Sequence, residues 1–167
     1  MEIRTIGPFI DYWESVRGRT KRVVGSIPAD RMDWTYMPGK FTFGDIIRHL
    51  ATIERYMYAE TVQGRPSSYA GYAGSLQKEG ESPAELMDRL HAESVDIFKG
   101  LTDEDLTKKC VTPAGSSITI WKWLRAMVEH EAHHRGQIFM MLSMLGITAQ
   151  PLYGLTEEEV RAKSAPH

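Results

Sequence analysis

The sequence predicts an all-α protein, a four-helix bundle with a long crossover between the second and third helices. Hydrophobic residues recur at the spacing of a helix face through most of the chain, and the alternation typical of strands is nearly absent. Two capping boxes mark where helices begin. The long polar segment between the second and third helices is typical of bundles that have a crossover connection.

The first two helices are expected from their start signals and their apolar periodicity. The first extends from about Pro8 to Ile27, because proline suits a first helical turn, where its missing N–H costs nothing. The second begins at Thr42, which has capping-box spacing from Asp45, and it fades near Gly64.

The third and fourth helices follow a glycine-rich segment, residues 63–81. This segment is longer than the ~2–8 residues that join antiparallel neighbours, so it should return along the bundle and leave the second and third helices parallel. The third helix begins after Ser82, which has Glu85 at capping-box spacing, and continues to about Gly100. The fourth extends from about Thr119 to Leu145.

Two smaller elements are expected near the fourth helix. Residues 108–117 contain a proline and a glycine and suit a short extended hairpin. Gly146 can terminate the fourth helix, and a short fifth helix is expected after Thr156, which has capping-box spacing from Glu159.

Composition restricts the class of protein. Charged residues make up 25% of the chain and hydrophobic residues 42%, which is ordinary for a globular domain. The net charge of −2, without a block of like charges, argues against binding nucleic acid by phosphate neutralisation. Neither a signal peptide nor a membrane-spanning apolar run is recognisable. We therefore expect one domain across residues 1–167, cytoplasmic, without nucleic-acid or membrane partners.

Three histidines lie close together within the predicted fourth helix. At about 100° per residue, His134 falls about 40° from the centre of the apolar face and His130 about 80° on the same side, whereas His133 points about 140° away. His130 and His134 are therefore an i, i+4 pair, neighbours on the helix surface that can share one metal ion. Zn²⁺ takes three or four ligands in proteins, so a further ligand is required.

His49 is the candidate third ligand, since it lies about 60° from the apolar centre of the second helix. If the second and fourth helices are antiparallel, the depths of His49 and His134 in the bundle agree within about 3 Å; if they are parallel, the depths differ by roughly 13 Å. A lone histidine on an apolar face is more often a hydrogen-bonded core residue, as we expect for His91. The methionines, Met127, Met140, Met141 and Met144 among them, are expected to fill the core.

Glu131 lies about 20° from the centre of the apolar face of the fourth helix, where a carboxylate is costly to bury. One interpretation is a buried ion pair with an arginine such as Arg48 or Arg135; the other is a carboxylate that acts beside the metal, as a base or by orienting a ligand. The segment His130–His134 also matches the H-E-x-x-H signature of zinc proteases, in which the glutamate is the base. No strand edge for an extended peptide is expected, so a protease is the least favoured interpretation.

Two segments, Pro38–Tyr56 and His130–Ile138, together resemble the DinB/YfiT-like family, and the resemblance covers nearly the whole chain. It implies an up-down-down-up four-helix bundle, usually a homodimer. It also implies a divalent metal ion, often zinc or nickel, held by His49, His130 and His134. Related families include bacillithiol-dependent thiol transferases and a mycothiol-dependent maleylpyruvate isomerase, which implies that the metal could bind a thiol or a water molecule.

The leading hypothesis is therefore a metal-dependent thiol transferase or hydrolase that acts on a small molecule. The alternative is a non-catalytic bundle that binds a small molecule or a partner and holds a structural metal ion.

Overall fold

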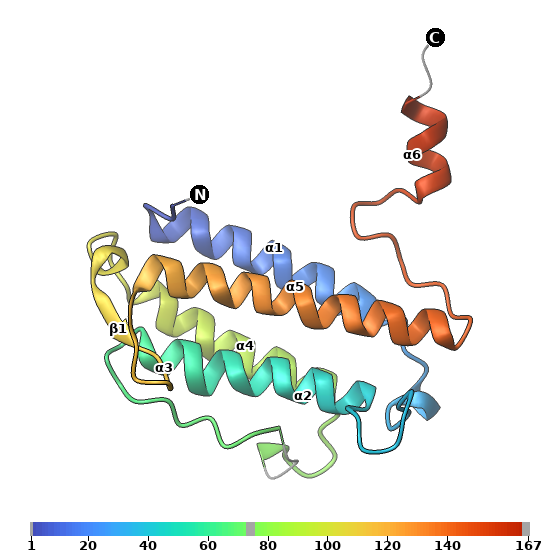
Figure 1. Cartoon of the computed structure of the whole chain (residues 1–167), viewed down its shortest axis with the longest axis horizontal. Coiled ribbons are helices and arrows are strands. Elements are labelled where there is room, and N and C mark those ends of the chain that lie inside the picture. The colour runs from blue at the N-terminus through green and yellow to red at the C-terminus, as the bar shows by residue number, and fades with distance from the viewer. Residues whose placement is uncertain (1, 73–75, 165–167) are drawn as a thin grey trace.

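The computed structural model describes residues 2–72 and 76–164. Its bundle consists of α1 (Ile6–Val24), α2 (Phe43–Ile53), α4 (Pro83–Lys99) and α5 (Ile120–Met144) (Figure 1). α2 packs against α4 and α5, and α1 packs against the same two helices. α2 and α4 run in one direction and α1 and α5 in the other, so the four-helix prediction is confirmed and the order is up-down-down-up (Figure 1).

Local sequence signals set the starts of α2 and α4. The Asp45 N–H donates to Thr42 Oγ1, and the Thr42 N–H donates to the Asp45 carboxylate, both at 3.0 Å. Ser82 and Glu85 form the same reciprocal pair at the start of α4, at 3.2 and 2.8 Å. Because each side chain satisfies a free N–H of the first helical turn, both starts agree with the prediction.

The first helix begins and ends earlier than expected. α1 extends from Ile6 to Val24, whereas its periodicity suggested Pro8 to Ile27. The Ile6 N–H donates to Asp103 Oδ1 at 2.8 Å, so a side chain from a distant loop satisfies this helix start. No local signal in the sequence could reveal such a partner.

The second helix is interrupted by a π-helical turn, η2 (Glu54–Tyr58), and continues as α3 (Ala59–Thr61). A π turn has i→i+5 hydrogen bonds and is rare. Its first residue, Glu54, is buried in the bundle. The described parts of the following segment, residues 64–72 and 76–82, lie along the outside of the bundle between α3 and α4, as expected for a crossover (Figure 1).

The smaller elements lie at the ends of the bundle. η1 (Ala29–Arg31) precedes α2, and η4 (Asp105–Thr107) precedes a two-stranded hairpin. Its strands β1 (Lys109–Val111) and β2 (Ser117–Thr119) are antiparallel, which confirms the expected extended segment. α6 (Glu157–Ser164) projects away from the bundle (Figure 1). Over the described residues, no helix combines the length and the apolar character needed to cross a membrane.

The core has two apolar clusters separated by a polar layer. One cluster includes Trp13 and Phe98, and the other includes Leu50 and Leu90. The buried polar and charged residues between them are Arg17, Thr20, Thr52, Glu54, His91, Ser94, Glu131, His134 and Arg135. Each of the four long helical segments contributes to this layer, so buried charges are concentrated near the middle of the bundle.

Candidate metal centre

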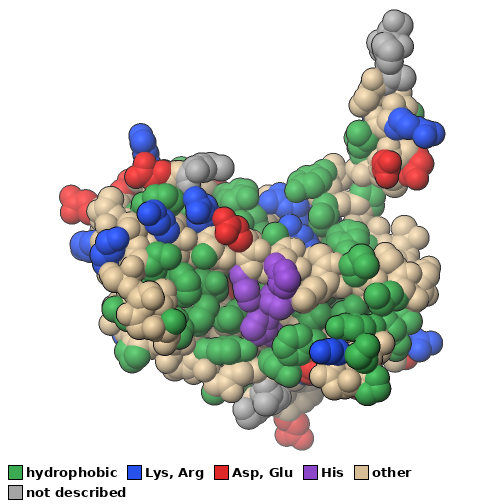
Figure 2. Space-filling view, viewed as in Figure 1, with side chains coloured by type: hydrophobic (Ala, Val, Ile, Leu, Met, Phe, Trp, Pro, Cys, Tyr) green, Lys and Arg blue, Asp and Glu red, His purple; other side chains and the backbone are tan. Residues whose placement is uncertain are grey.

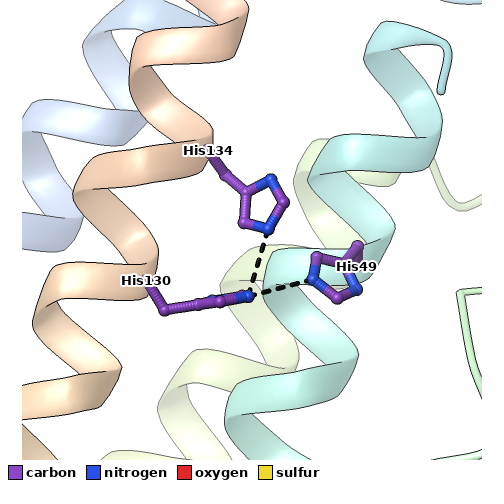
Figure 3. A group of neighbouring side chains, drawn as sticks. All are labelled: His49, His130 and His134. Atoms are coloured by element: carbon purple, nitrogen blue, oxygen red, sulfur yellow. Dashed lines mark hydrogen bonds between the residues drawn. The ribbon is translucent and has the colours of Figure 1, made fainter. Parts of the chain in front are cut away.

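His49 from α2 and the pair His130 and His134 from α5 point toward one another (Figure 3). The Nε2 atoms of His49 and His134 each lie 3.1 Å from Nε2 of His130. One ring nitrogen of each histidine lies within 4.8 Å of the other two. The convergence depends on the antiparallel arrangement of α2 and α5, which places His49 and His134 at the same depth in the bundle, as predicted from the sequence.

Neighbouring side chains orient two of the rings. His134 Nδ1 lies 2.7 Å from Gln137 Oε1. An amide oxygen only accepts hydrogen bonds, so His134 carries its proton on Nδ1 and turns the lone pair of Nε2 toward the cluster. His49 Nδ1 lies 2.7 Å from Tyr69 Oη, on the crossover segment.

The environment keeps all three imidazoles neutral. Burial, together with the repulsion that a second protonated ring at His134 would cause, lowers the pKa of His49 to about 4. Burial and the neighbouring histidines lower the pKa of His130 to about 3. Burial also lowers the pKa of His134. Neutral imidazole is the protonation state that binds a metal ion.

The donor set fits a divalent ion. Nε2 of His130 contacts the Nε2 atoms of both His49 and His134. It can carry only one proton, so it cannot donate a full hydrogen bond to both of them. A cation accepts all three lone pairs at once. With Zn–N bonds of about 2.0–2.1 Å, nitrogens 3.1 Å apart subtend roughly 100° at a shared ion, close to a tetrahedral angle. Imidazole nitrogen suits zinc and nickel, among other transition metals.

The cluster faces the solvent on one side. Histidine side chains lie together on one face of the molecule, between patches of hydrophobic side chains (Figure 2). His49 and His130 are partly exposed, and the ring of Phe41 stacks on His49 at 6.0 Å. A small molecule can therefore reach the histidines without passing through the core.

The two other histidines that the structure describes lie outside the cluster, as expected. His133 is exposed, and its Nε2 accepts from Gln137 Nε2 at 3.2 Å. His91 is buried, and its two ring nitrogens contact carboxylates of Glu54 and Glu14 at 2.9 and 3.2 Å.

A model of the DinB superfamily matches residues 12–138, most of the chain. The chain belongs to the DinB superfamily. Among curated relatives, the protein YjoA of Bacillus subtilis strain 168 is 25% identical over 150 residues, which cover 86% of this chain and 93% of YjoA.

Solved structures of DinB-like proteins have the same fold. The crystal structure of B. subtilis YjoA has a TM-score of 0.71 at 22% identity and covers 90% of this chain and 100% of its own. A DinB-like protein from Bacillus cereus ATCC 10987 has a TM-score of 0.69 at 21% identity, with 89% and 97% covered. B. subtilis YfiT, described as a probable metal-dependent hydrolase with an unusual four-helix bundle topology, has a TM-score of 0.67 at 21% identity, with 86% and 89% covered.

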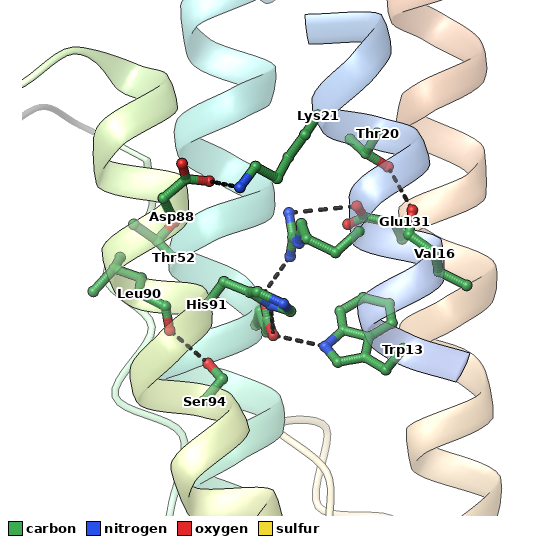
Figure 4. Close-up of polar contacts among 12 residues, drawn as sticks. Trp13, Val16, Thr20, Lys21, Thr52, Asp88, Leu90, His91, Ser94 and Glu131 are labelled. Atoms are coloured by element: carbon green, nitrogen blue, oxygen red, sulfur yellow. Dashed lines mark hydrogen bonds and ion pairs between the residues drawn. The ribbon is translucent and has the colours of Figure 1, made fainter. Parts of the chain in front are cut away.

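Glu131 of this DinB-superfamily chain forms a buried ion pair, but with neither of the expected arginines. Its Oε1 lies 3.4 Å from Nη1 of Arg17, in α1 (Figure 4). Arg48 is instead paired with Asp45 at 2.7 Å. Arg135 donates to a hydroxyl and a carbonyl oxygen of α1 rather than to a carboxylate. The prediction of a buried pair was right and both named partners were wrong, because helix packing across the bundle selects the partner.

Arg17 and Glu54 are the central buried residues that the sequence interpretation missed. Arg17 is 1% exposed and donates to the Glu54 carboxylate, which also accepts from Trp13 Nε1 at 2.8 Å (Figure 4). Burial lowers the pKa of Arg17, but Glu131 and Glu54 outweigh it and the net shift is upward. A local signal existed, since Arg17 follows Trp13 at i+4 and so lies on the same buried face of α1.

Proposed function

We propose that this DinB-superfamily protein binds one divalent metal ion, zinc or nickel, through His49, His130 and His134, and hydrolyses a small-molecule substrate there. The convergence of three neutral imidazole nitrogens at a solvent-facing position carries this proposal. The shared fold with YfiT, described as a probable metal-dependent hydrolase, supports the choice of reaction class.

The chain's own groups position the ligands. When bound, a divalent ion acts as a Lewis acid and lowers the pKa of a coordinated water to about 7. Tyr69 and Gln137 accept the Nδ1 protons of His49 and His134, which fixes the ring orientations and leaves both Nε2 atoms as donors to the metal.

Glu131 has no base role in this proposal. Its side chain is buried and is held beside Arg17 in the polar layer of the core. A zinc protease with the H-E-x-x-H signature needs that glutamate at the metal-bound water. The buried pair with Arg17 therefore argues against the protease interpretation.

Metal analysis of untagged protein tests the site. We expect about one divalent ion per chain in the wild type and in His133→Ala, and a large loss in His134→Ala. His133 is the matched control, because it is the neighbouring residue and its ring faces solvent. Equal metal content in the wild type and in His134→Ala would contradict the proposal.

A thiol transferase is the second candidate, favoured by a trough of about 830 Å³ beside Tyr69. Arg65 and Lys109 line this trough, and no acidic residue does among the described residues. Arg65 is already paired with Glu60 at 2.7 Å, so Lys109 supplies the charge for an anion. Tyr69 links it to His49, so the trough could hold an anionic low-molecular-weight thiol such as bacillithiol close to the metal.

Turnover assays separate the candidates. The metal-loaded protein is incubated with activated esters and with electrophiles, with and without low-molecular-weight thiols. Consumption of the ester without a thiol supports a hydrolase, and strict dependence on a thiol supports a transferase. Absence of both reactions from metal-loaded protein would favour a bundle with a structural metal ion.

A further inference from the structure

An apolar groove of about 510 Å³ lies beside the histidine cluster, along the C-terminal half of α5. The apolar side chains that line it are Tyr36, Phe41, Ile46, Met140, Met141 and Met144. The groove meets the metal site at two residues. Phe41 stacks on His49, and Gln137 lines the groove while it bonds to His134.

Two of the lining methionines are not core residues, contrary to the prediction. Met127 and Met141 are 2% and 3% exposed, whereas Met140 and Met144 are 61% and 57% exposed. Tyr36 on the opposite wall is 49% exposed. Exposed apolar side chains gathered at a groove mark a binding surface, and methionine adapts to ligands of different shapes.

Gly136 keeps the groove open beside the metal site. It lies within α5, where glycine destabilises a helix relative to alanine. A Cβ atom built on Gly136 would meet no atom within 4 Å, so neither packing nor backbone conformation requires glycine here. The missing side chain instead leaves space next to Gln137.

The charge of the groove favours an anion. Lys40 is its one residue with a permanent charge, and no acidic residue lines it among the described residues. Within those residues Lys40 has no carboxylate within ion-pair distance. The lining positions from His133 to Met144 span about 16 Å of helix, long enough for an extended chain.

We propose that this groove binds the apolar body of a small-molecule substrate that carries one negative charge, with Lys40 as the partner of the anion. The assignment of this ligand as a substrate rests on the proposed metal-dependent function, because two lining residues, Phe41 and Gln137, contact the proposed metal ligands His49 and His134. Binding in the groove would place the ligand beside the metal ion.

Calorimetric titration of metal-loaded protein with decanoate, and with decyltrimethylammonium as the cationic counterpart, tests the groove. Gly136→Leu fills the groove, and Gly18→Leu is the matched control, because Gly18 also lies inside a helix with no atom within 4 Å of a built Cβ. We expect decanoate to bind wild type and Gly18→Leu equally, and Gly136→Leu at least tenfold more weakly. Lys40→Met should weaken decanoate binding roughly two- to fivefold, as for an exposed ion pair.

The outcomes separate this proposal from the metal site. Wild-type protein that holds metal but fails to bind decanoate would overturn the groove and leave the metal centre intact. If the protein fails to take up a metal ion but still binds decanoate, the groove is a binding site and the metal-dependent reaction is overturned. Equal affinity for the cationic probe would overturn the role of Lys40. Light scattering tests the other occupant, a second copy of the chain. If wild type is a dimer that does not bind decanoate and Gly136→Leu is a monomer, the groove is an interface between copies and the proposal is overturned.

Discussion

Replacing Arg17 with methionine tests whether the buried ion cluster stabilises the bundle. Arg17 is the buried cation between Glu54 and Glu131, and both glutamates are 1% exposed as whole residues. Methionine keeps much of the length of the side chain and removes the charge. The variant therefore leaves the Glu131 carboxylate in the core without a cation, with little change in packed volume. Glu54 loses one partner but keeps its contacts with Trp13 and His91.

The expected cost is large. Removing one partner of a buried ion pair costs about 3–5 kcal/mol, because the remaining charge is neither solvated nor paired. Glu54 keeps Trp13 and His91, so the cost comes chiefly from Glu131 and we expect a loss within this range. At roughly 2–4 °C per kcal/mol for a domain of this size, the melting temperature should fall by about 6–20 °C.

Urea unfolding monitored by circular dichroism measures the loss, and Lys21→Met is the matched control. Lys21 lies in the same helix and pairs with Asp88 at 2.9 Å, but both side chains are about half exposed. An exposed pair contributes about 0–1 kcal/mol. Burial already raises the pKa of Glu131, and the loss of Arg17 should raise it further, so the destabilisation should shrink as the pH is lowered.

A loss below about 1 kcal/mol in Arg17→Met, equal to that in Lys21→Met, would refute this reasoning. A loss that stays constant between pH 7 and pH 4.5 would show that unpaired carboxylates are not its cause.

Three further predictions follow from the site and the helix caps. Tyr69→Phe should weaken metal binding roughly 10–100-fold by competition with a chelator, whereas Tyr72→Phe, which removes no hydrogen bond to the cluster, should not. Because the folded-state pKa of His130 is lowered to about 3, metal-free protein should lose stability as pH falls below about 6.5, and His130→Gln should reduce that slope. Thr42→Ala should cost about 1 kcal/mol in urea unfolding, whereas Thr5→Ala, at a helix start without a side-chain cap, should cost little. Equal metal affinities of Tyr69→Phe and Tyr72→Phe would contradict the first prediction. Stability of the metal-free protein that does not change with pH would contradict the second, and equal losses in Thr42→Ala and Thr5→Ala would contradict the third.

Much of the candidate site could be predicted because it depends on helix geometry. An i, i+4 pair necessarily shares one helix face, so His130 and His134 were separable from His133 before any packing was known. The capping boxes at Thr42 and Ser82 are equally local, since both partners lie within one helical turn. The prediction that His49 lies beside this pair required that the second and fourth helices be antiparallel, and the long crossover is compatible with that direction.

The partners of the site residues could not be predicted in the same way. Arg17 and Glu131 lie on different helices, and the rotation of each helix about its axis decides which side chains meet. The π turn that begins at Glu54 changes the face presented by the residues after it, and no residue type in that segment announces it.

The sequence by itself determined the four helices, the starts of two of them and the pairing of His130 with His134, because these follow from periodicity and from contacts between neighbouring turns of one helix. Only the tertiary structure decided that Glu131 belongs to the buried charges around Arg17, and that Met140 and Met144 line an open groove rather than the core. The physical reason is that burial and charge pairing depend on what a neighbouring helix places opposite each residue, and the spacing of residues within one helix carries no information about that neighbour.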